Sequence, residues 1–158
     1  MRGESPAAAK VVVVDATVII HLAKAERLHL LGALQGWEFV VPDQVVEEVT
    51  YPEQAATLKA ALAAGHLRQE SSTDTTEIAL YAELRTRMGK GEAACLAMAA
   101  TRGWLLASDD RGRAFRRLVH ERIGPDRLID TARIAEAARE KEGAFADDAT
   151  HIPELAGD

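Results

Sequence analysis

The feature that most constrains the fold is an unbroken run of four valines at 11–14, which ends at Asp15. An apolar run without polar alternation is typical of a strand buried on both faces, as in a parallel sheet. A helical spacing of apolar residues follows the run, continues to Leu34 and ends at Gly36. The beginning of the chain therefore predicts a strand followed by a helix, the repeating unit of α/β proteins.

The same alternation continues along the rest of the chain. We expect strands at 37–42, 66–71, 104–108 and 127–130. We expect a helix that opens at Pro42-Asp43 and is ended or kinked by Pro52, a second at 53–65 with Gly65 as its stop, and others at 73–87, 89–103, 111–122 and 131–142. Thr131 is expected to cap the last helix. The apolar side of the 73–87 helix is expected to hold Ile78, Leu80, Tyr81 and Leu84. This order predicts an α/β fold, a three-layer sandwich with a central, mostly parallel sheet.

A length of 158 residues suits one domain, which we place at 11–142. Residues 1–10 are expected to form a loose leader, and 143–158 an acidic C-terminal tail. The single cysteine, Cys95, excludes an intramolecular disulfide framework and is expected in the core of a cytoplasmic protein. No apolar run is long enough for a membrane span, so we expect no membrane partner.

The formal net charge of −6 disfavours a generic nucleic-acid coat protein, but the charge is unevenly distributed. Residues 38–83 and the segment beyond 136 are acidic. The stretch 85–117 carries eight basic side chains and only three acidic ones, Glu92, Asp109 and Asp110. Ion pairs on helix faces would explain these three acids singly.

Acidic residues also follow two of the predicted buried strands. Asp15 follows the valine run, and Asp109 and Asp110 follow 104–108. Ligands of parallel sheets bind at the carboxyl ends of the strands, so these acids could face one crevice. Glu92, at the start of the preceding helix, could join them. Converging carboxylates need a compensating cation, and hard oxygen ligands suit Mg²⁺ or Mn²⁺.

Glu47 or Glu48, on the helix after 37–42, could supply a further carboxylate. Each of these acids also has a purely structural explanation. The aspartates could cap the helices that follow them, and the glutamates could be solvent-exposed charges. Taken singly, the structural explanations are favoured; taken jointly, the ordered set of acids indicates a site.

Three segments that carry these acids resemble the PIN domain, a metal-dependent ribonuclease fold found in bacterial toxin–antitoxin systems. They are VVVVDATVIIHLAK, PDQVVEEV and GKGEAACLAMAATRGWLLASDDRGRAF. The first resembles the opening strand and Asp, the second the segment with the second acid. The third resembles the closing half, with Gly-Glu-Ala, a strand and Ser/Thr-x-Asp. The resemblance covers about residues 11–130 and is greatest to the VapC-like toxins.

The resemblance implies roles for particular residues. The catalytic acids would be Asp15, Glu48, Glu92 and Asp110. One or two Mg²⁺ or Mn²⁺ ions would be held by Asp15, Glu92 and Asp110, with Asp109 as an accessory ligand. Thr17 and Ser108 would hydrogen-bond the ligands or a water molecule. The third acid of the family is often Asp, whereas this chain has Glu92.

Four arginines follow Asp110 closely and could hold RNA phosphates or pair with the acidic tail. They are Arg111, Arg113, Arg116 and Arg117. We therefore predict a Mg/Mn-dependent endoribonuclease that hydrolyses RNA phosphodiester bonds. The resemblance further implies a toxin with a small antitoxin protein as partner, and a homodimer.

Two other functions stay open. One is a catalytically silent PIN-like module that binds RNA or protein. The other is a Mg-dependent phosphatase or a phosphoacceptor of another α/β fold, with Asp15 phosphorylated; residue 17 is Thr, not the second Asp of an Asp-x-Asp motif. The five histidines have no zinc-ligand spacing, and GKG at 89–91 lacks the Ser or Thr of a phosphate-binding loop.

Overall fold

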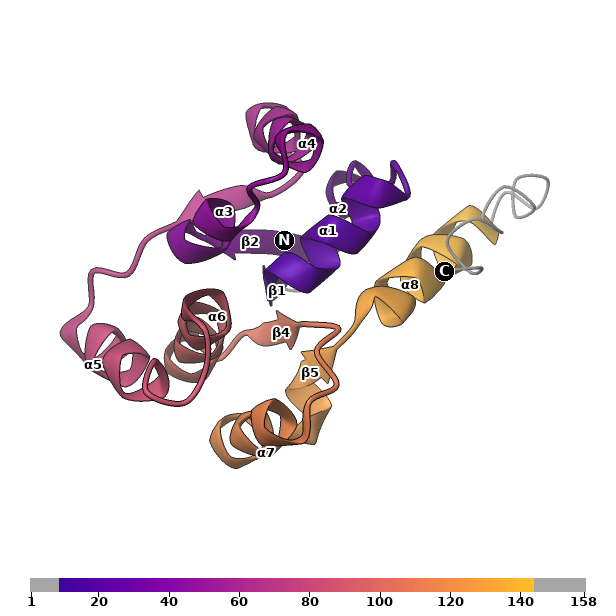
Figure 1. Ribbon diagram of the computed structural model, residues 1–158. Helices are drawn as coiled ribbons and strands as arrows, with labels where there is room; N and C mark the ends of the chain where they lie inside the picture. Colours follow the sequence, from indigo (N-terminus) through magenta and orange to yellow (C-terminus); the bar gives the residue numbers. More distant parts are fainter. Residues whose placement is uncertain (1–8, 144–158) are drawn as a thin grey trace, which may run out of the picture.

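The computed structural model describes residues 9–143 and has a five-stranded sheet at its centre (Figure 1). The strands are β1 (Lys10–Val14), β2 (Trp37–Pro42), β3 (Arg68–Glu70), β4 (Leu105–Ala107) and β5 (Leu128–Ile129). Their order is β3-β2-β1-β4-β5, and all neighbouring strands are parallel. Val12, Val13 and Val14 are fully buried in the central strand, which explains why the valine run has no polar alternation.

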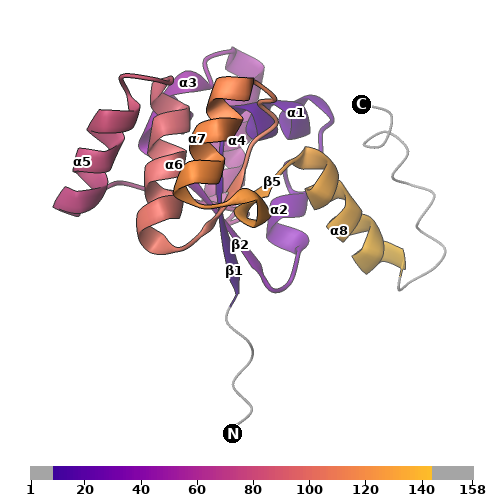
Figure 2. The same ribbon diagram turned by 90° about the horizontal axis from the view of Figure 1, so that it is seen from below.

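The helices cover both faces of the sheet. They are α1 (Ala16–Lys24), α2 (Leu30–Ala33), α3 (Asp43–Glu48), α4 (Pro52–Ala63), α5 (Thr75–Leu84), α6 (Lys90–Arg102), α7 (Arg113–Arg122) and α8 (Thr131–Gly143), with a 3-10 turn at Pro125–Arg127. Figure 1 shows α1, α2, α4 and α8 on one face and α5, α6 and α7 on the other. Figure 2 shows α6 between α5 and α7. The predicted three-layer sandwich is confirmed.

Helix α6 lies at the centre of its layer, and most of its buried side chains are small. Every residue from Ala93 to Ala99 is buried, and the helix packs on β1, β2 and β4. Cys95 is fully buried there, as expected of a core residue. Burial raises the pKa of its thiol well above the usual value, with nearby carboxylates adding to the effect, so the thiol stays protonated.

The segment expected to be helical up to Leu34 is two helices. Helix α1 ends at Lys24, and Glu26 has a φ of 57°, in the left-handed region that interrupts a right-handed helix. The amide of Arg27 then donates to the carbonyl of Leu22 at 2.8 Å, and α2 begins at Leu30. Leu34 is still buried, so two short helices satisfy the apolar spacing that predicted one.

The prediction for the apolar side of α5 is wrong at Ile78, which is 45% exposed. Its neighbour Glu77 is buried instead, at 1% exposure. The guanidinium of Arg102, near the end of α6, pairs with Glu77 at 2.8 Å, and Ser72 and Thr101 also donate to it. Burial by itself raises the pKa of Glu77, but these hydrogen bonds lower it to about 2. The partners lie on other elements, so no local pattern reveals the buried carboxylate.

The start of α8 also differs from the prediction. Thr131 is the first helical residue rather than the cap. The carboxylate of Asp130 accepts the amide of Arg133 at 2.9 Å and so caps the helix.

The two expected terminal segments lie mostly outside the described residues, which exclude 1–8 and 144–158. Lys10, expected in the loose leader, pairs with Trp37 in the sheet, so β1 begins there. Within residues 9–143, every helix is too short or too polar to cross a bilayer.

Candidate active site

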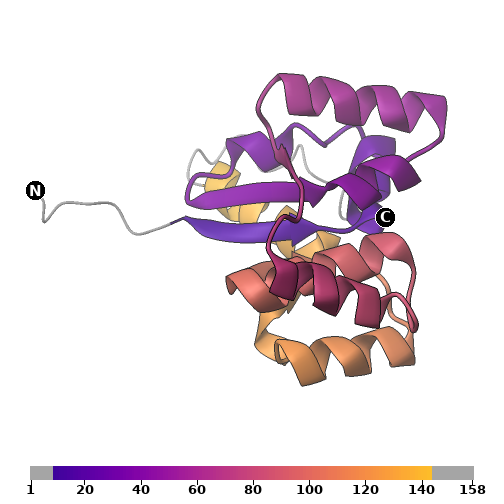
Figure 3. The same cartoon turned by 90° about the vertical axis from the view of Figure 1, so that its left-hand side faces the viewer.

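The strands at the centre of the sheet end along one edge, and this edge collects the predicted acids. Figure 3 shows β1 and β2 side by side, with their arrowheads at the same end. Asp15 follows β1, and its amide donates to the carbonyl of Ala107 at the end of β4, at 2.9 Å. The register therefore places Asp15 next to the loop that contains Asp110.

Asp15 is only 2% exposed, and two hydroxyl groups hold its carboxylate. Thr17 Oγ1 donates to Asp15 Oδ2 at 3.0 Å, and Ser108 Oγ donates to the same oxygen at 3.1 Å. The side chain makes no capping hydrogen bond to α1, so helix capping does not explain this residue. Burial raises the pKa of Asp15, the hydrogen bonds oppose the rise, and the charge of Glu48 adds to it.

The same two hydroxyl groups orient the loop after β4. The amide of Asp109 donates to Thr17 Oγ1 at 3.0 Å, and the amide of Asp110 donates to Ser108 Oγ at 3.1 Å. Thr17 and Ser108 thus each hydrogen-bond both the carboxylate of Asp15 and the backbone of this loop, which fixes the loop relative to Asp15.

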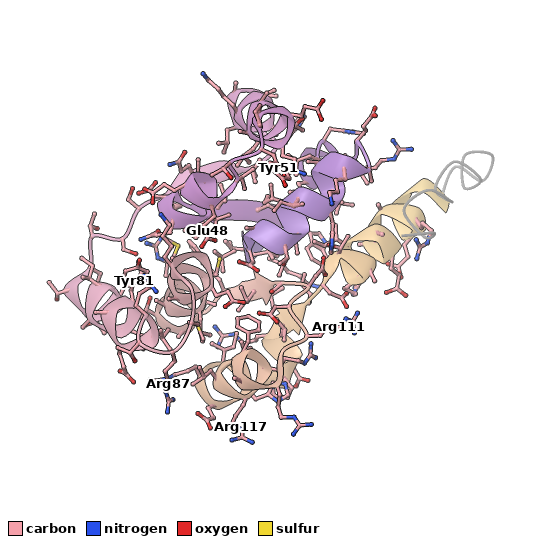
Figure 4. All side chains as sticks on the ribbon, in the orientation of Figure 1. Glu48, Tyr51, Tyr81, Arg87, Arg111 and Arg117 are labelled. Atoms are coloured by element: carbon pink, nitrogen blue, oxygen red, sulfur yellow. The ribbon has the colours of Figure 1, made fainter. Side chains whose placement is uncertain are left out.

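The structure distinguishes the two adjacent glutamates of α3. Glu47 is 59% exposed, and its Oε1 pairs with Lys90 Nζ at 2.8 Å. Glu48 lies between α3 and α6 (Figure 4), and its Oε2 accepts the amide of Gly91 at 3.3 Å. The charge of Glu48 also raises the pKa of both Asp15 and Glu92. Glu48 therefore forms an acidic cluster with Asp15 and Glu92, and Glu47 lies outside it.

Glu92 and Asp110 complete this cluster. Burial raises the pKa of Glu92 to about 8, with further contributions from a hydrogen bond to Asp110 and from the charges of Asp110, Asp15 and Glu48. The hydrogen bond with Glu92 lowers the pKa of Asp110, and the charge of Arg116 lowers it further. Asp110 Oδ1 also accepts the amide of Gly112 at 2.7 Å. At neutral pH, Glu92 therefore holds a proton that it shares with Asp110.

The four carboxylates have the chemistry that a divalent cation requires. They provide hard oxygen ligands, and Glu92 is protonated because it is half-buried and the negative charges of the others raise its pKa further. As the side chains lie, no group of three or more His, Cys, Asp and Glu residues within 9–143 is arranged to hold a metal ion. The donor set fits a divalent cation, which would have to displace the proton of Glu92.

Asp109, expected as an accessory ligand, is occupied by other partners. Its Oδ1 accepts the amide of Thr131 at 2.8 Å, and its Oδ2 bonds Thr131 Oγ1 and His21 Nδ1, each at 2.5 Å. Burial by itself raises the pKa of Asp109, but these hydrogen bonds lower it. The side chain of Asp109 thus joins α1 to the start of α8. Sequence reasoning missed this role of His21, because the two partners lie 88 residues apart.

The four predicted arginines lie in one region of the surface, beside and along α7. They are all exposed and line a shallow depression of about 600 Å³ together with His120 and Glu121. Figure 4 shows Arg111 and Arg117 projecting outward from this region. Among the ion pairs of residues 9–143, only a 3.9 Å contact from Arg111 to Asp130 involves this group.

A model of the PIN-domain family matches residues 11–120 of the chain. This match covers more than two thirds of the sequence. The chain belongs to the PIN-domain family. PIN domains have a nuclease-like fold and typically use divalent metals, which agrees with the carboxylate cluster at the sheet edge. No curated protein matches this PIN domain.

Proposed function

We propose that this PIN domain is a Mg²⁺- or Mn²⁺-dependent endoribonuclease. The observation that carries the proposal is the meeting of four carboxylates from separate segments. Asp15 follows β1, Glu48 ends α3, Glu92 is in the first turn of α6, and Asp110 follows β4. The charges of the other three all raise the pKa of Glu92, as close neighbours do. No protein nucleophile is needed for hydrolysis at such a centre.

The residues of the chain have separate tasks in this proposal. Asp15, Glu48, Glu92 and Asp110 would hold the ion or ions. A bound divalent ion would activate water and stabilise negative charge on the phosphate. Thr17 and Ser108 hold the carboxylate of Asp15 in one orientation, so that this ligand is preorganised.

The arginine surface supports RNA as the substrate. Arg113, Arg116 and Arg117 share one face of α7, which begins three residues after Asp110. The charge of Arg116 reaches the cluster, since it lowers the pKa of Asp110. Phosphates bound along this face would bring an RNA strand to the carboxylates, and the binding would be mainly electrostatic. The acidic tail, the alternative partner of these arginines, lies outside the described residues.

A role as the toxin of a toxin–antitoxin pair extends this proposal, with a small antitoxin protein as partner and a homodimer as the assembly. Its support is the likeness of the Gly-Glu-Ala and Asp-Asp segments to toxin-like PIN ribonucleases. Expression should arrest growth, and co-expression of the product of the neighbouring gene should relieve the arrest. Harmless expression of the folded, active protein would contradict the toxin role but not the nuclease.

Cleavage of labelled RNA tests the nuclease directly. We expect cleavage with Mg²⁺ or Mn²⁺, none with EDTA, and a loss of at least about 100-fold in Asp15→Asn and Asp110→Asn. Glu47→Gln is the matched control, because Glu47 is exposed and outside the cluster. Undiminished cleavage in EDTA or in either aspartate variant would contradict the mechanism. Metal and RNA binding without cleavage would favour the catalytically silent module.

A further inference from the structure

The carboxylate of Glu48 packs directly against Gly91 of α6. A Cβ atom built on Gly91 would lie 2.1 Å from Glu48 Oε1 and 2.9 Å from its Cδ, far closer than atoms can approach. The amide of Gly91 also donates to Glu48 Oε2 at 3.3 Å. The backbone of Gly91 thus supplies both the space and a hydrogen bond for the carboxylate of Glu48.

The backbone conformation of Gly91 does not require glycine. Gly91 is not one of the residues within 9–143 that have a positive φ, and it lies in the first turn of the regular helix α6. Glycine is among the least favourable residues within a helix, whereas alanine is the most favourable. The neighbouring Gly89 gives a contrast, because a Cβ there would lie 3.9 Å from Glu48 Oε2, an ordinary contact.

We propose that Gly91 is a positioning residue for the metal centre, which holds Glu48 in the cluster by leaving room for its carboxylate. This inference rests on the proposed function, since the centre itself is part of that proposal. The amide of Gly91 also donates a hydrogen bond to Glu48. One proposed ligand, Glu48, is therefore oriented by the helix that carries another, Glu92.

Replacement of Gly91 should displace Glu48 without unfolding the protein. The atoms that a Cβ would meet belong to the far end of a flexible side chain, not to backbone. Glu48 is only partly buried, so its carboxylate can swing toward solvent. The change should therefore alter the site and leave the fold intact, which separates positioning from a structural role.

Calorimetry with Mn²⁺ and thermal unfolding of the metal-free protein test this prediction together. We expect Gly91→Ala to bind Mn²⁺ about 10- to 100-fold more weakly, with a melting temperature equal to or above that of the wild type. Gly89→Ala should keep the affinity of the wild type. A crystal structure of metal-free Gly91→Ala should show the Glu48 carboxylate moved away from residue 91.

A double-mutant comparison identifies the route of the effect. In a Glu48→Ala background the space beside residue 91 is empty, so Gly91→Ala should cause no further loss of Mn²⁺ affinity. An equal loss in both backgrounds, or a Glu48 carboxylate that keeps its place in Gly91→Ala, would overturn the inference. Absence of Mn²⁺ binding in the wild type would refute the proposed metal centre, whereas the position of Glu48 in the metal-free crystal would still decide the role of Gly91.

Discussion

The side chains of Glu92 and Asp110 hydrogen-bond each other, although both are carboxyl groups. Such a bond needs a proton on one of the two partners. The pKa of Glu92 is raised to about 8 while that of Asp110 is lowered, so Glu92 carries the proton at neutral pH. The metal-free cluster thus reduces its charge repulsion with a proton, and this gives two predictions about pH.

The first prediction concerns the stability of the metal-free protein. Between the usual pKa of Glu, near 4.5, and about 8, the folded protein binds a proton at Glu92 that the unfolded chain has lost. The free energy of unfolding should therefore fall as pH rises through this range, by at most about 1.4 kcal/mol for each increase of one in pH, and less because Glu92 is partly exposed to solvent. Urea unfolding in EDTA measures this slope. Glu92→Gln should flatten it, and an unchanged slope in that variant would assign the pH dependence to other groups.

The second prediction concerns proton release. A cation that binds at Glu92 must displace its proton, so Mg²⁺ or Mn²⁺ binding near pH 7 should release about one proton. Calorimetry in two buffers of different ionisation enthalpy measures this number. The release should fall toward zero above about pH 9, where Glu92 is already ionised. In Glu92→Gln it should fall toward zero at every pH. Equal release from both proteins would place the displaced proton elsewhere.

Asp109 and Asp110 should behave oppositely when each is changed to Asn. Asp109→Asn weakens the bonds to Thr131 and His21 that join α1 to α8, so it should lower the free energy of unfolding by about 1–3 kcal/mol. Asp110→Asn should change stability little and metal affinity strongly. Urea unfolding and Mn²⁺ titration separate the two effects. Loss of metal affinity in Asp109→Asn without loss of stability would instead indicate that Asp109 is a metal ligand.

The arginine face predicts a salt dependence of RNA binding. Each phosphate contact removed from a single strand should reduce the slope of log affinity against log salt by about 0.7. We expect this reduction for Arg113→Ala, Arg116→Ala and Arg117→Ala, measured by fluorescence anisotropy with a short RNA in EDTA. Lys59→Ala is the control, because Lys59 is exposed on α4 in the opposite layer. Identical slopes in all four variants would exclude this face as the RNA-binding surface.

Glu77 should matter for stability alone. Glu77→Ala removes the hydrogen bonds from Ser72, Thr101 and Arg102 and should lower the free energy of unfolding by about 1–3 kcal/mol. Because the pKa of Glu77 is lowered to about 2, its contribution is complete above the usual pKa of Glu and is lost as pH falls through about 2. Glu83→Ala breaks an exposed pair with Arg122 and should change stability by less than about 1 kcal/mol. Equal effects of the two changes would contradict the importance of burial.

The sequence by itself determined the layers of the protein. An unbroken apolar run predicted a strand buried on both faces of a parallel sheet, and the structure makes this strand, β1, the middle one of the sheet. The positions of Pro and Gly predicted where most of the helices begin or end, because these residues act on the backbone locally. Asp15 and the Asp109-Asp110 pair could also be named from the sequence, since carboxylates that follow buried strands reach the ligand-binding edge of a parallel sheet. The choice of Glu48, Glu92 and Asp110 as the acids that join Asp15 was implied by the resemblance to PIN domains.

Only the tertiary structure decided which acids share one environment. Glu47 and Glu48 are adjacent in sequence, but the direction of each side chain depends on the packing of α3 against α6. Asp109 and Asp110 differ because α8 begins next to the first of them. Glu77 is buried because Arg102 meets it from another helix. These choices depend on contacts between distant segments, which no local pattern encodes, because a side chain's partners are set by packing and not by spacing.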